Sequence, residues 1–528
     1  MLRCRRVRRG REALSGQIHG MFGKRREGMK EVLYNSTRGG ECGVSASQAV
    51  LKGLAGDGGL FMPEHIPGFD FDPEELIGAS YQEVAYRVMR LFLTDYTEEE
   101  LRHCIDSAYD GKFDTEEIAP LSRADGAYYL ELFHGKTIAF KDMALSILPY
   151  LMTTAAQKNG VSNTIEILTA TSGDTGKAAM AGFADVPGTG IIVFYPKGGV
   201  SRFQELQMVT QRGENTSVVA IHGNFDDAQS AVKNIFGDRS FEERLAAQGI
   251  QLSSANSINI GRLVPQVVYY VWSYLKLREA EEIEKGEQIN VCVPTGNFGN
   301  ILAAYFAKCM GLPVKKLICA SNDNKVLFDF FRTGRYDRNR EFILTSSPSM
   351  DILVSSNLER LLYMSCGGDA AENRVMMRQL KSVGRYTVTL DMRERMKDFV
   401  GYYADQEEVA VRIRELYENT GYVIDTHTAV ASAVYEKYRA ESGDETKTVI
   451  ASTASPFKFS RAVMTAIRGE LGEMDDWEIL ELLKETAGIP LPPAVEEIRE
   501  AEIRHRRECD PDAMEQEVAD ILKLKGHR

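Results

Sequence analysis

The stretch Ile289–Asn300, INVCVPTGNFGN, decides how the rest of this chain is interpreted. Four of its first five residues are apolar, which predicts a buried β-strand. The glycine-rich turn that follows, Pro294–Asn300, leads into a predicted helix. A strand that enters a glycine-rich loop and then a helix is the repeating unit of a parallel α/β sheet. In such sheets ligands bind beyond the carboxyl ends of the strands.

The same unit recurs along the chain. Further strands are predicted over residues 128–133, 164–169, 190–194, 217–221, 317–320 and 448–451. Repeated strand-loop-helix units indicate a parallel sheet with helices on both faces. With 528 residues the chain is too long for one such sheet, so we expect two.

Composition narrows the class of protein. The net charge of -13, from 63 basic and 76 acidic residues, argues against non-specific nucleic-acid binding. No run of about 18 apolar residues is present, so no membrane span is predicted. The eight cysteines form no C-x-x-C pair, which argues against a disulfide framework or a zinc site. Buried free thiols in a reducing cytoplasm are the better interpretation.

Two loops have the composition of anion sites. In Pro294–Asn300, glycines allow N–H groups to converge at a helix start, which favours a single phosphate. The alternative is a tight turn, since the loop is neither a Walker A motif nor a dinucleotide fingerprint. Thr169–Gly176, TATSGDTG, offers hydroxyls and N–H groups to a second anion such as a carboxylate. Because a carboxylate repels an anion, Asp174 is expected to turn away and cap the helix.

Lys141 is the candidate reactive amine. It follows two hydrophobic residues and precedes an apolar stretch within His134–Leu145, HGKTIAFKDMAL. Partial desolvation at such a position lowers the pKa of a lysine and makes it nucleophilic. The alternative is an ordinary lysine at a helix terminus, with its charged end in water.

Three further polar segments are candidates. Arg262 ends the donor-rich segment Leu252–Arg262 and could bind phosphate or carboxylate oxygens, or could simply follow a helix cap. Ser452–Phe459 follows a predicted strand and could place a hydroxyl in a cleft or cap a helix. For His427, at the start of an Ala-rich helix, capping or local packing is favoured over catalysis.

Taken together, these segments resemble the threonine synthase family, in the branch shared by enterobacteria, clostridia and fungi. The matching stretches occur in the family's order over about residues 30–525. They are Tyr34–Gly39, Gly58–Pro63, Phe133–Asp142, Thr171–Gly176, Tyr195–Ser201, Gly223–Gln229, Asn256–Asn259, Pro294–Asn300, Ser349–Asn357 and Ser452–Ala454. The ordered set is far more specific than any one of its members.

The resemblance implies pyridoxal 5'-phosphate as cofactor and Lys141 as the catalytic residue that holds it as a Schiff base. The residues implied for the cofactor are Lys141, Gly296, Asn297, Phe298, Gly299 and Asn300 around its phosphate, and Thr453 at its pyridine nitrogen. Those implied for the substrate are Thr171, Ser172, Gly173, Asp174 and Thr175 for its carboxylate, Ser257, Asn259 and Arg262 for its phosphate, and Lys136 and Lys197 as weaker candidates.

The resemblance also implies fold type II, with two parallel-sheet α/β domains of the tryptophan synthase β kind, the cofactor between them, and a mainly helical N-terminal domain. The expected division is a basic leader over residues 1–28, an N-terminal domain over 29–125, a catalytic region over 126–475 and a helical tail over 476–528. A smaller α/β subdomain, about 142–250, is inserted in the catalytic region. The leader is rich in arginine but poor in serine, which favours a dispensable segment over an organelle transit peptide.

The implied reaction is the last step of threonine biosynthesis, from O-phospho-L-homoserine and water to L-threonine and phosphate by γ-elimination and β-hydration. A phospho-lyase that forms 2-oxobutyrate is the close alternative, and a non-catalytic scaffold with this fold is the distant one. The expected partner is this small substrate, with no nucleic acid, membrane or metal ion. The expected state is a cytoplasmic monomer or homodimer.

Overall fold

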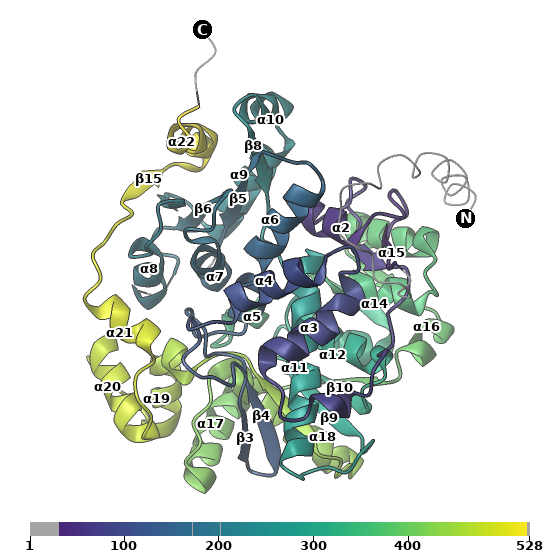
Figure 1. Cartoon of the computed structure of the whole chain (residues 1–528). Helices are drawn as coiled ribbons and strands as arrows, with labels where there is room; N and C mark the ends of the chain where they lie inside the picture. The colour runs from purple at the N-terminus through teal and green to yellow at the C-terminus, as the bar shows by residue number, and fades with distance from the viewer. Residues whose placement is uncertain (1–30, 172, 201, 525–528) are drawn as a thin grey trace.

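The computed structural model describes residues 31–171, 173–200 and 202–524. The predicted leader over residues 1–28 and the predicted site residue Ser172 lie outside the described residues. Figure 1 shows two helix-flanked sheets and a mostly helical N-terminal part. The predicted fold class, two parallel-sheet α/β domains of fold type II with a mainly helical N-terminal domain, is confirmed. The exact domain limits stay predictions.

The N-terminal part is built from short elements. They are β1 (Tyr34–Ser36), α2 (Ala46–Lys52), β2 (Phe61–Pro63), a 3-10 turn (Pro73–Leu76), α3 (Tyr81–Phe92) and α4 (Glu98–Ala108). The two strands pair antiparallel. Helix α3 begins where the Ser80 side chain accepts a hydrogen bond from the N–H of Glu83, a standard N-cap. The buried face of α3 packs on the long helix α11 (Ile260–Glu279), so this part covers the catalytic region.

The larger sheet has six strands in the order β13-β10-β9-β14-β4-β3. Their bounds are β13 (Phe399–Tyr403), β10 (Val314–Ser321), β9 (Ile289–Pro294), β14 (Thr448–Ser452), β4 (Ala127–Glu131) and β3 (Leu121–Ala124). All neighbours pair parallel except β3 with β4. Helices α11 and α12 (Gly299–Met310) lie toward one face, and α17 (Gln406–Thr420) and α18 (Thr426–Ser442) toward the other.

Alternation along β9 shows why the strand is apolar throughout. Val291 and Val293 belong to the core on the α11 and α12 side, whereas Cys292 belongs to the core on the α18 side. Successive residues of a strand point to opposite faces, and a strand covered on both faces needs apolar residues at nearly every position. The predicted strand at residues 289–293 is therefore confirmed, as β9.

The smaller sheet is wholly parallel, with five strands in the order β15-β7-β6-β5-β8. The strands are β5 (Thr164–Ala170), β6 (Thr189–Pro196), β7 (Thr216–Ile221), β8 (Ile250–Ser253) and β15 (Arg507–Cys509). The helices around this sheet are α5 (Asp142–Leu145), α6 (Leu148–Lys158), α7 (Asp174–Phe183), α8 (Arg202–Val209), α9 (Phe225–Gly237) and α10 (Arg239–Ala246).

An excursion between β10 and β13 carries small elements that frame the site. They are α13 (Val326–Thr333), β11 (Arg335–Asp337), α14 (Leu358–Ser365), α15 (Ala370–Val383), β12 (Arg385–Thr387) and α16 (Leu390–Arg395). Strands β11 and β12 pair antiparallel.

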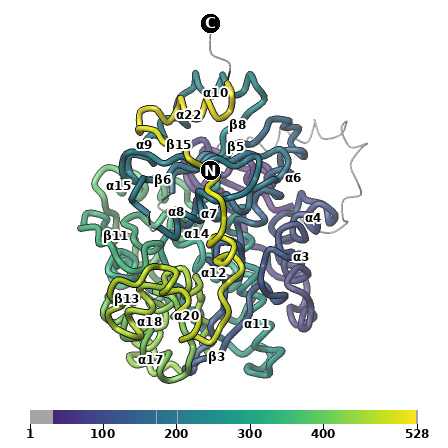
Figure 2. Tube along the Cα trace, turned by 90° about the vertical axis from the view of Figure 1, so that its left-hand side faces the viewer, coloured from purple at the N-terminus to yellow at the C-terminus, as the bar shows by residue number. Residues whose placement is uncertain are grey.

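The C-terminal tail differs from the prediction because it is not wholly helical. After α19 (Ser460–Arg468), α20 (Asp476–Ala487) and α21 (Pro493–Arg499), the chain crosses from the larger sheet to the smaller one. There it adds β15 beside β7 and ends in α22 (Met514–Ile521). Figures 1 and 2 show this yellow segment running alongside both sheets. The charged strand β15 forms only because the edge of β7 offers it hydrogen-bond partners. Among the described residues, no helix is long and apolar enough to cross a membrane.

Candidate active site

Loops from the carboxyl ends of both sheets meet at Lys141. The amine of Lys141 lies 3.4 Å from the Asp174 carboxylate, which follows β5 of the smaller sheet. Its chain neighbour Phe140 donates an N–H to the carbonyl of Thr453, which follows β14 of the larger sheet, at 2.8 Å. The candidate loops predicted from the sequence at residues 134–145, 169–176 and 452–459 are therefore brought together where the two sheets meet.

The Lys141 side chain is only 12% exposed, and its amine also donates to Ser349 Oγ at 3.0 Å. Burial lowers the pKa of Lys141, and although Asp174 opposes this effect, the net direction is down. A desolvated amine with a lowered pKa is neutral more of the time, and the neutral form is the nucleophile and the base. The geometry agrees with the reactive lysine predicted from the sequence.

Asp174 does not cap its helix, contrary to the expectation from the sequence. It is the first residue of α7, and no side-chain cap bond is present there. Its carboxylate faces Lys141 and also Lys458, whose amine lies 3.3 Å from Asp174 Oδ1. Burial alone would raise the pKa of Asp174, but the two lysines outweigh it and hold the pKa well below its usual range. Two buried cations thus outcompete the local preference for a cap.

Lys458 is a site residue that the sequence analysis missed. Its side chain is fully buried, and its amine donates to the carbonyl of Thr137 at 3.0 Å and pairs with Asp174. It lies in Ser452–Phe459, which the sequence analysis considered for its hydroxyls only. The available signal was a cation between two phenylalanines, since a lysine there is buried only if a carboxylate meets it.

His427 reaches the site through the main chain of Ser349. Its Nδ1 lies 2.8 Å from Asp425 Oδ2, and its Nε2 accepts the N–H of Ser349 at 3.2 Å. Because Nε2 accepts, the ring proton sits on Nδ1 and donates to Asp425. Ser349 Oγ in turn donates to Asp174 Oδ2 at 3.0 Å. The predicted local packing of His427 thus also positions the hydroxyl that contacts Lys141.

The loop after β9 presents unused main-chain donors. Among the described residues, the N–H groups of Gly296, Asn297 and Phe298 donate to no acceptor. A Cβ at Gly296 would lie 2.6 Å from the carbonyl oxygen of Ser349, so only glycine fits there. Phe298 has a left-handed backbone (φ 65°), and its ring packs on Phe331 and Phe399. The loop is held in an unusual shape that leaves its donors free.

Asn300 adds a buried donor to the same loop. Its Oδ1 accepts the hydroxyl of Tyr270, while its Nδ2 is buried and without a partner among the described residues. An unpaired buried donor is costly unless a ligand satisfies it. With the free N–H groups and the start of α12, this arrangement fits a phosphate group. The residues present therefore fit pyridoxal phosphate, with its phosphate at 296–300 and Lys141 as the amine.

Arg262 is the clearest candidate for binding an anion. It is 3% exposed, and Nη1 donates to the carbonyl of Ala255 at 2.9 Å, while Nε is buried without a partner among the described residues. It forms no ion pair with a described carboxylate, and burial lowers its pKa to about 10. Arg262 is also close enough to contribute to the lowered pKa of Lys141.

Some predicted residues are already engaged within the protein. Asn259 is the N-cap of α11, where Oδ1 accepts from Gly261 and Nδ2 donates to the carbonyl of Val50. The hydroxyl oxygen of Thr171 accepts the N–H groups of Gly173 and Gly176, both at 3.0 Å. These two side chains therefore shape the loops, and their spare capacity for a ligand is small.

The remaining candidates differ in exposure. Thr175 and Ser257 are half-buried, Lys136 is exposed, and Lys197 forms an exposed ion pair with Glu508. That pair joins the loop after β6 to β15 of the tail, so Lys197 has a structural partner that the sequence did not suggest.

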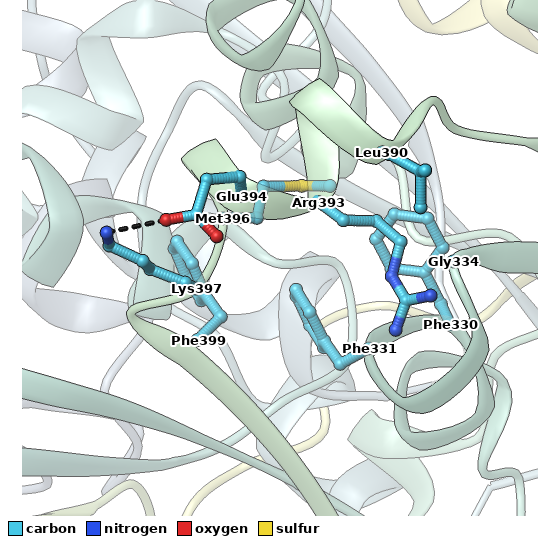
Figure 3. A pocket seen from close by; sticks show the side chains of 9 residues that line it. All are labelled: Phe330, Phe331, Gly334, Leu390, Arg393, Glu394, Met396, Lys397 and Phe399. Atoms are coloured by element: carbon cyan, nitrogen blue, oxygen red, sulfur yellow. Dashed lines mark hydrogen bonds and ion pairs between the residues drawn. The ribbon is translucent and has the colours of Figure 1, made fainter.

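A separate pocket of about 490 Å³ lies against α13, α16 and β13 (Figure 3). None of the predicted site residues lines it, but Phe331 and Phe399 in its wall are the rings that pack on Phe298. Within residues 31–171, 173–200 and 202–524, no group of three or more His, Cys, Asp or Glu side chains could hold a metal ion.

Three models of known protein families match the chain. The chain matches the family models described as Threonine synthase N terminus over residues 33–109, Pyridoxal-phosphate dependent enzyme over 114–454, and Threonine synthase, C-terminal over 428–518.

Individual relatives agree with these family models. Threonine synthase-like 1 of Macaca fascicularis is 39% identical over 498 residues, which are 91% of this chain and 65% of that relative. This chain thus spans about 65% of the length of that relative. Threonine synthase of Schizosaccharomyces pombe is 38% identical over 472 residues, covering 83% of this chain and 90% of the relative. The crystal structure of PLP-bound threonine synthase from Brucella melitensis has a TM-score of 0.81 at 35% identity, covering 93% of this chain and 99% of that one.

Proposed function

Because the chain belongs to the threonine synthase family of pyridoxal-phosphate-dependent enzymes, we propose that it converts O-phospho-L-homoserine and water to L-threonine and phosphate. The observation that carries this proposal is Arg262, a buried cation with an unpartnered Nε beside the reactive lysine. A buried arginine without a carboxylate partner is costly, and an anionic substrate would offset that cost.

Two groups near Lys141, Arg262 and the start of α7, suit the two anionic ends of this substrate. Thr175, in the first turn of α7, is assigned to the substrate carboxylate, because a helix N-terminus favours an anion; the N–H of Gly173 is already taken by Thr171 Oγ1. Arg262 is assigned to the substrate phosphate. The free donors of residues 296–300 are then left for the phosphate of the cofactor.

Proton transfer is assigned to Lys141. Bound pyridoxal phosphate supplies an electron sink for the electron pair left at Cα when its proton departs. The neutral amine of Lys141 removes that proton, and a desolvated amine suits this task near neutral pH. Ser349 Oγ, 3.0 Å from Lys141 Nζ, holds the amine in place.

Lys458 and Asp174 support the reactive amine. Asp174 faces Lys141, and Lys458 keeps Asp174 ionised when Lys141 gives up its charge. Without the second lysine, a buried carboxylate beside a neutral amine would take up a proton. The predicted cytoplasmic location and the monomeric or homodimeric state stay predictions.

Identifying the products formed from O-phospho-L-homoserine tests the proposal. We expect the purified protein, supplied with pyridoxal phosphate, to release threonine and phosphate in equal amounts. Mainly 2-oxobutyrate would replace the synthase with a phospho-lyase, and no phosphate release would reject both. Lys141→Ala serves as the inactive control, and Lys285→Ala, which changes an exposed lysine paired with Asp72, as the active one.

A further inference from the structure

Arg360 is a fully buried arginine that is not among the site residues predicted from the sequence. It lies in the first turn of α14, and its relative exposure is 0%. Each guanidinium nitrogen donates to a different segment of the chain. Nε bonds to the carbonyl of Phe61 at 3.1 Å, Nη2 bonds to the carbonyl of Ile258 at 2.6 Å, and Nη1 bonds to Asn357 Oδ1.

These three segments have different roles. Phe61 belongs to β2 of the N-terminal part, and Ile258 directly precedes Asn259, the N-cap of α11, which carries Arg262. Asn357 holds the loop of residues 296–300, here called the cofactor-phosphate loop. Its main-chain N–H and its Nδ2 both donate to the carbonyl of Asn297, at 3.0 and 2.9 Å. Arg360 therefore joins the loop of residues 296–300 to the start of α11.

The hydrogen bond from Arg360 decides how the Asn357 amide is turned. Since Nη1 needs an acceptor, Oδ1 of Asn357 must face it, and Nδ2 is left to face Asn297. Neighbouring Ser355 Oγ donates to the carbonyl of Gly296 at 2.7 Å. Two successive carbonyls are thus held on one side of the loop.

Holding these carbonyls directs the loop's donors. In a trans peptide the N–H points opposite to the C=O of the same unit. The carbonyls of Gly296 and Asn297 face Ser355 and Asn357, so the N–H groups of Asn297 and Phe298 face the other way. Those N–H groups are among the free donors that fit a phosphate.

The charge of Arg360 favours a role beyond packing. It forms no ion pair with a described carboxylate, since its neighbour Glu359 is taken by Arg38 at 2.7 Å. Burial lowers the pKa of Arg360 to about 9. A buried cation without a paired anion is costly, and apolar side chains would pack the same space at a lower cost.

We propose that Arg360 is a positioning residue that orients Asn357, and through it the donors of the cofactor-phosphate loop, and that aligns this loop with the start of α11. This inference rests on the proposed function for the identity of the substrate. The effect of Arg360 on cofactor binding is expected whatever the substrate is. Lysine at this position keeps the charge but cannot serve three acceptors in three directions.

Cofactor affinity tests the proposal directly. Titrating the apoprotein with pyridoxal phosphate and following absorbance gives a Kd without any substrate. Arg360→Lys is expected to raise this Kd about tenfold or more, from the loss of hydrogen bonds that fix the loop. It is also expected to raise the KM for O-phospho-L-homoserine, because the start of α11 loses its tie to the loop.

Arg412→Lys is the matched control. Arg412 is also a buried arginine, but it pairs with Asp125 and donates to Ser432 away from the cofactor loop. It is expected to lower the melting temperature with little change in the cofactor Kd. An Arg360→Lys protein that melts like the control and binds the cofactor within twofold of the unchanged chain would overturn the proposal.

A second variant covers failure of Arg360→Lys to fold. Asn357→Asp keeps an acceptor for Arg360 and gives it an ionic partner, so the fold is expected to hold, but the Nδ2 donor to Asn297 is lost. We expect its cofactor Kd to rise about tenfold, and an unchanged Kd would also overturn the proposal. If the unchanged chain forms no threonine, the proposed function fails, while these Kd values still decide the role of Arg360.

Discussion

Replacing Arg262 with methionine should stabilise the protein without ligand and weaken substrate binding. Arg262 is buried, donates one hydrogen bond to Ala255, and has no ionic partner among the described residues. Methionine has similar length, fills the same space and carries no charge. The two expected effects have opposite signs, so the variant separates a ligand-binding arginine from a structural one.

The size of the stability effect follows from the pKa of Arg262. Burial lowers that pKa from 12.5 to about 10. The cation is disfavoured in the folded state at every pH below about 10. At pH 7 this costs on the order of 3 kcal/mol, at about 1.4 kcal/mol per tenfold change in proton affinity. Losing the hydrogen bond to Ala255 reduces this gain in stability by about 1 kcal/mol. The free energy of unfolding should therefore rise by about 2 kcal/mol.

The binding effect should be larger. Each charge-assisted hydrogen bond to a phosphate contributes about 1.5–3 kcal/mol, so losing two should raise the KM at least about 100-fold. Urea unfolding of the unliganded protein and the KM for O-phospho-L-homoserine measure the two effects. The matched control is Arg412→Met, which leaves Asp125 without its ion pair and should destabilise the protein. A destabilised Arg262→Met protein with an unchanged KM would refute the reasoning.

Three other changes have expected outcomes. Lys141→Ala should lower kcat at least about 1,000-fold while the protein stays folded, because the amine supplies both cofactor attachment and proton transfer; residual turnover within tenfold would contradict this. Lys458→Met should lower the free energy of unfolding by about 3 kcal/mol. It should also move the acid limb of the kcat/KM profile to higher pH, because Asp174 loses a cation that lowers its pKa. An acid limb that stays in place would argue against the Lys458–Asp174 pair. Burial opposes the charged form of His134, but Asp114 and Glu131 outweigh this effect and raise the pKa of His134 to about 9. His134→Gln should therefore be less stable than the unchanged chain below pH 6.5, and urea unfolding should show this difference fading as the pH rises through 9. An equal difference in stability at pH 6 and pH 10 would exclude this linkage.

The sequence predicted those parts of the fold that local patterns determine. The strands at 289–293, 164–169 and 448–451 are found as β9, β5 and β14, because buried parallel strands are apolar throughout. The loop of residues 296–300 was predicted from its position, because it follows such a strand and leads into a helix.

What the sequence did not predict depends on residues that are distant along the chain. Asp174 was expected to cap α7, but Lys458 reaches it only when the two sheets are brought together. The strand β15 is charged and three residues long, and it pairs only because β7 has a free edge. The role of Arg360 depends on the meeting of three segments far apart in the chain, so no local pattern indicates it.

The attachment of the cofactor to Lys141 is the most direct test of this account. Borohydride reduction of the protein loaded with pyridoxal phosphate, followed by peptide mass spectrometry, identifies the lysine that carries the cofactor. Lys177 and Lys458 are buried lysines near Lys141, so the result discriminates among the three. We predict a single labelled peptide that contains Lys141. A label on Lys458 or Lys177, or no label at all, would contradict the account.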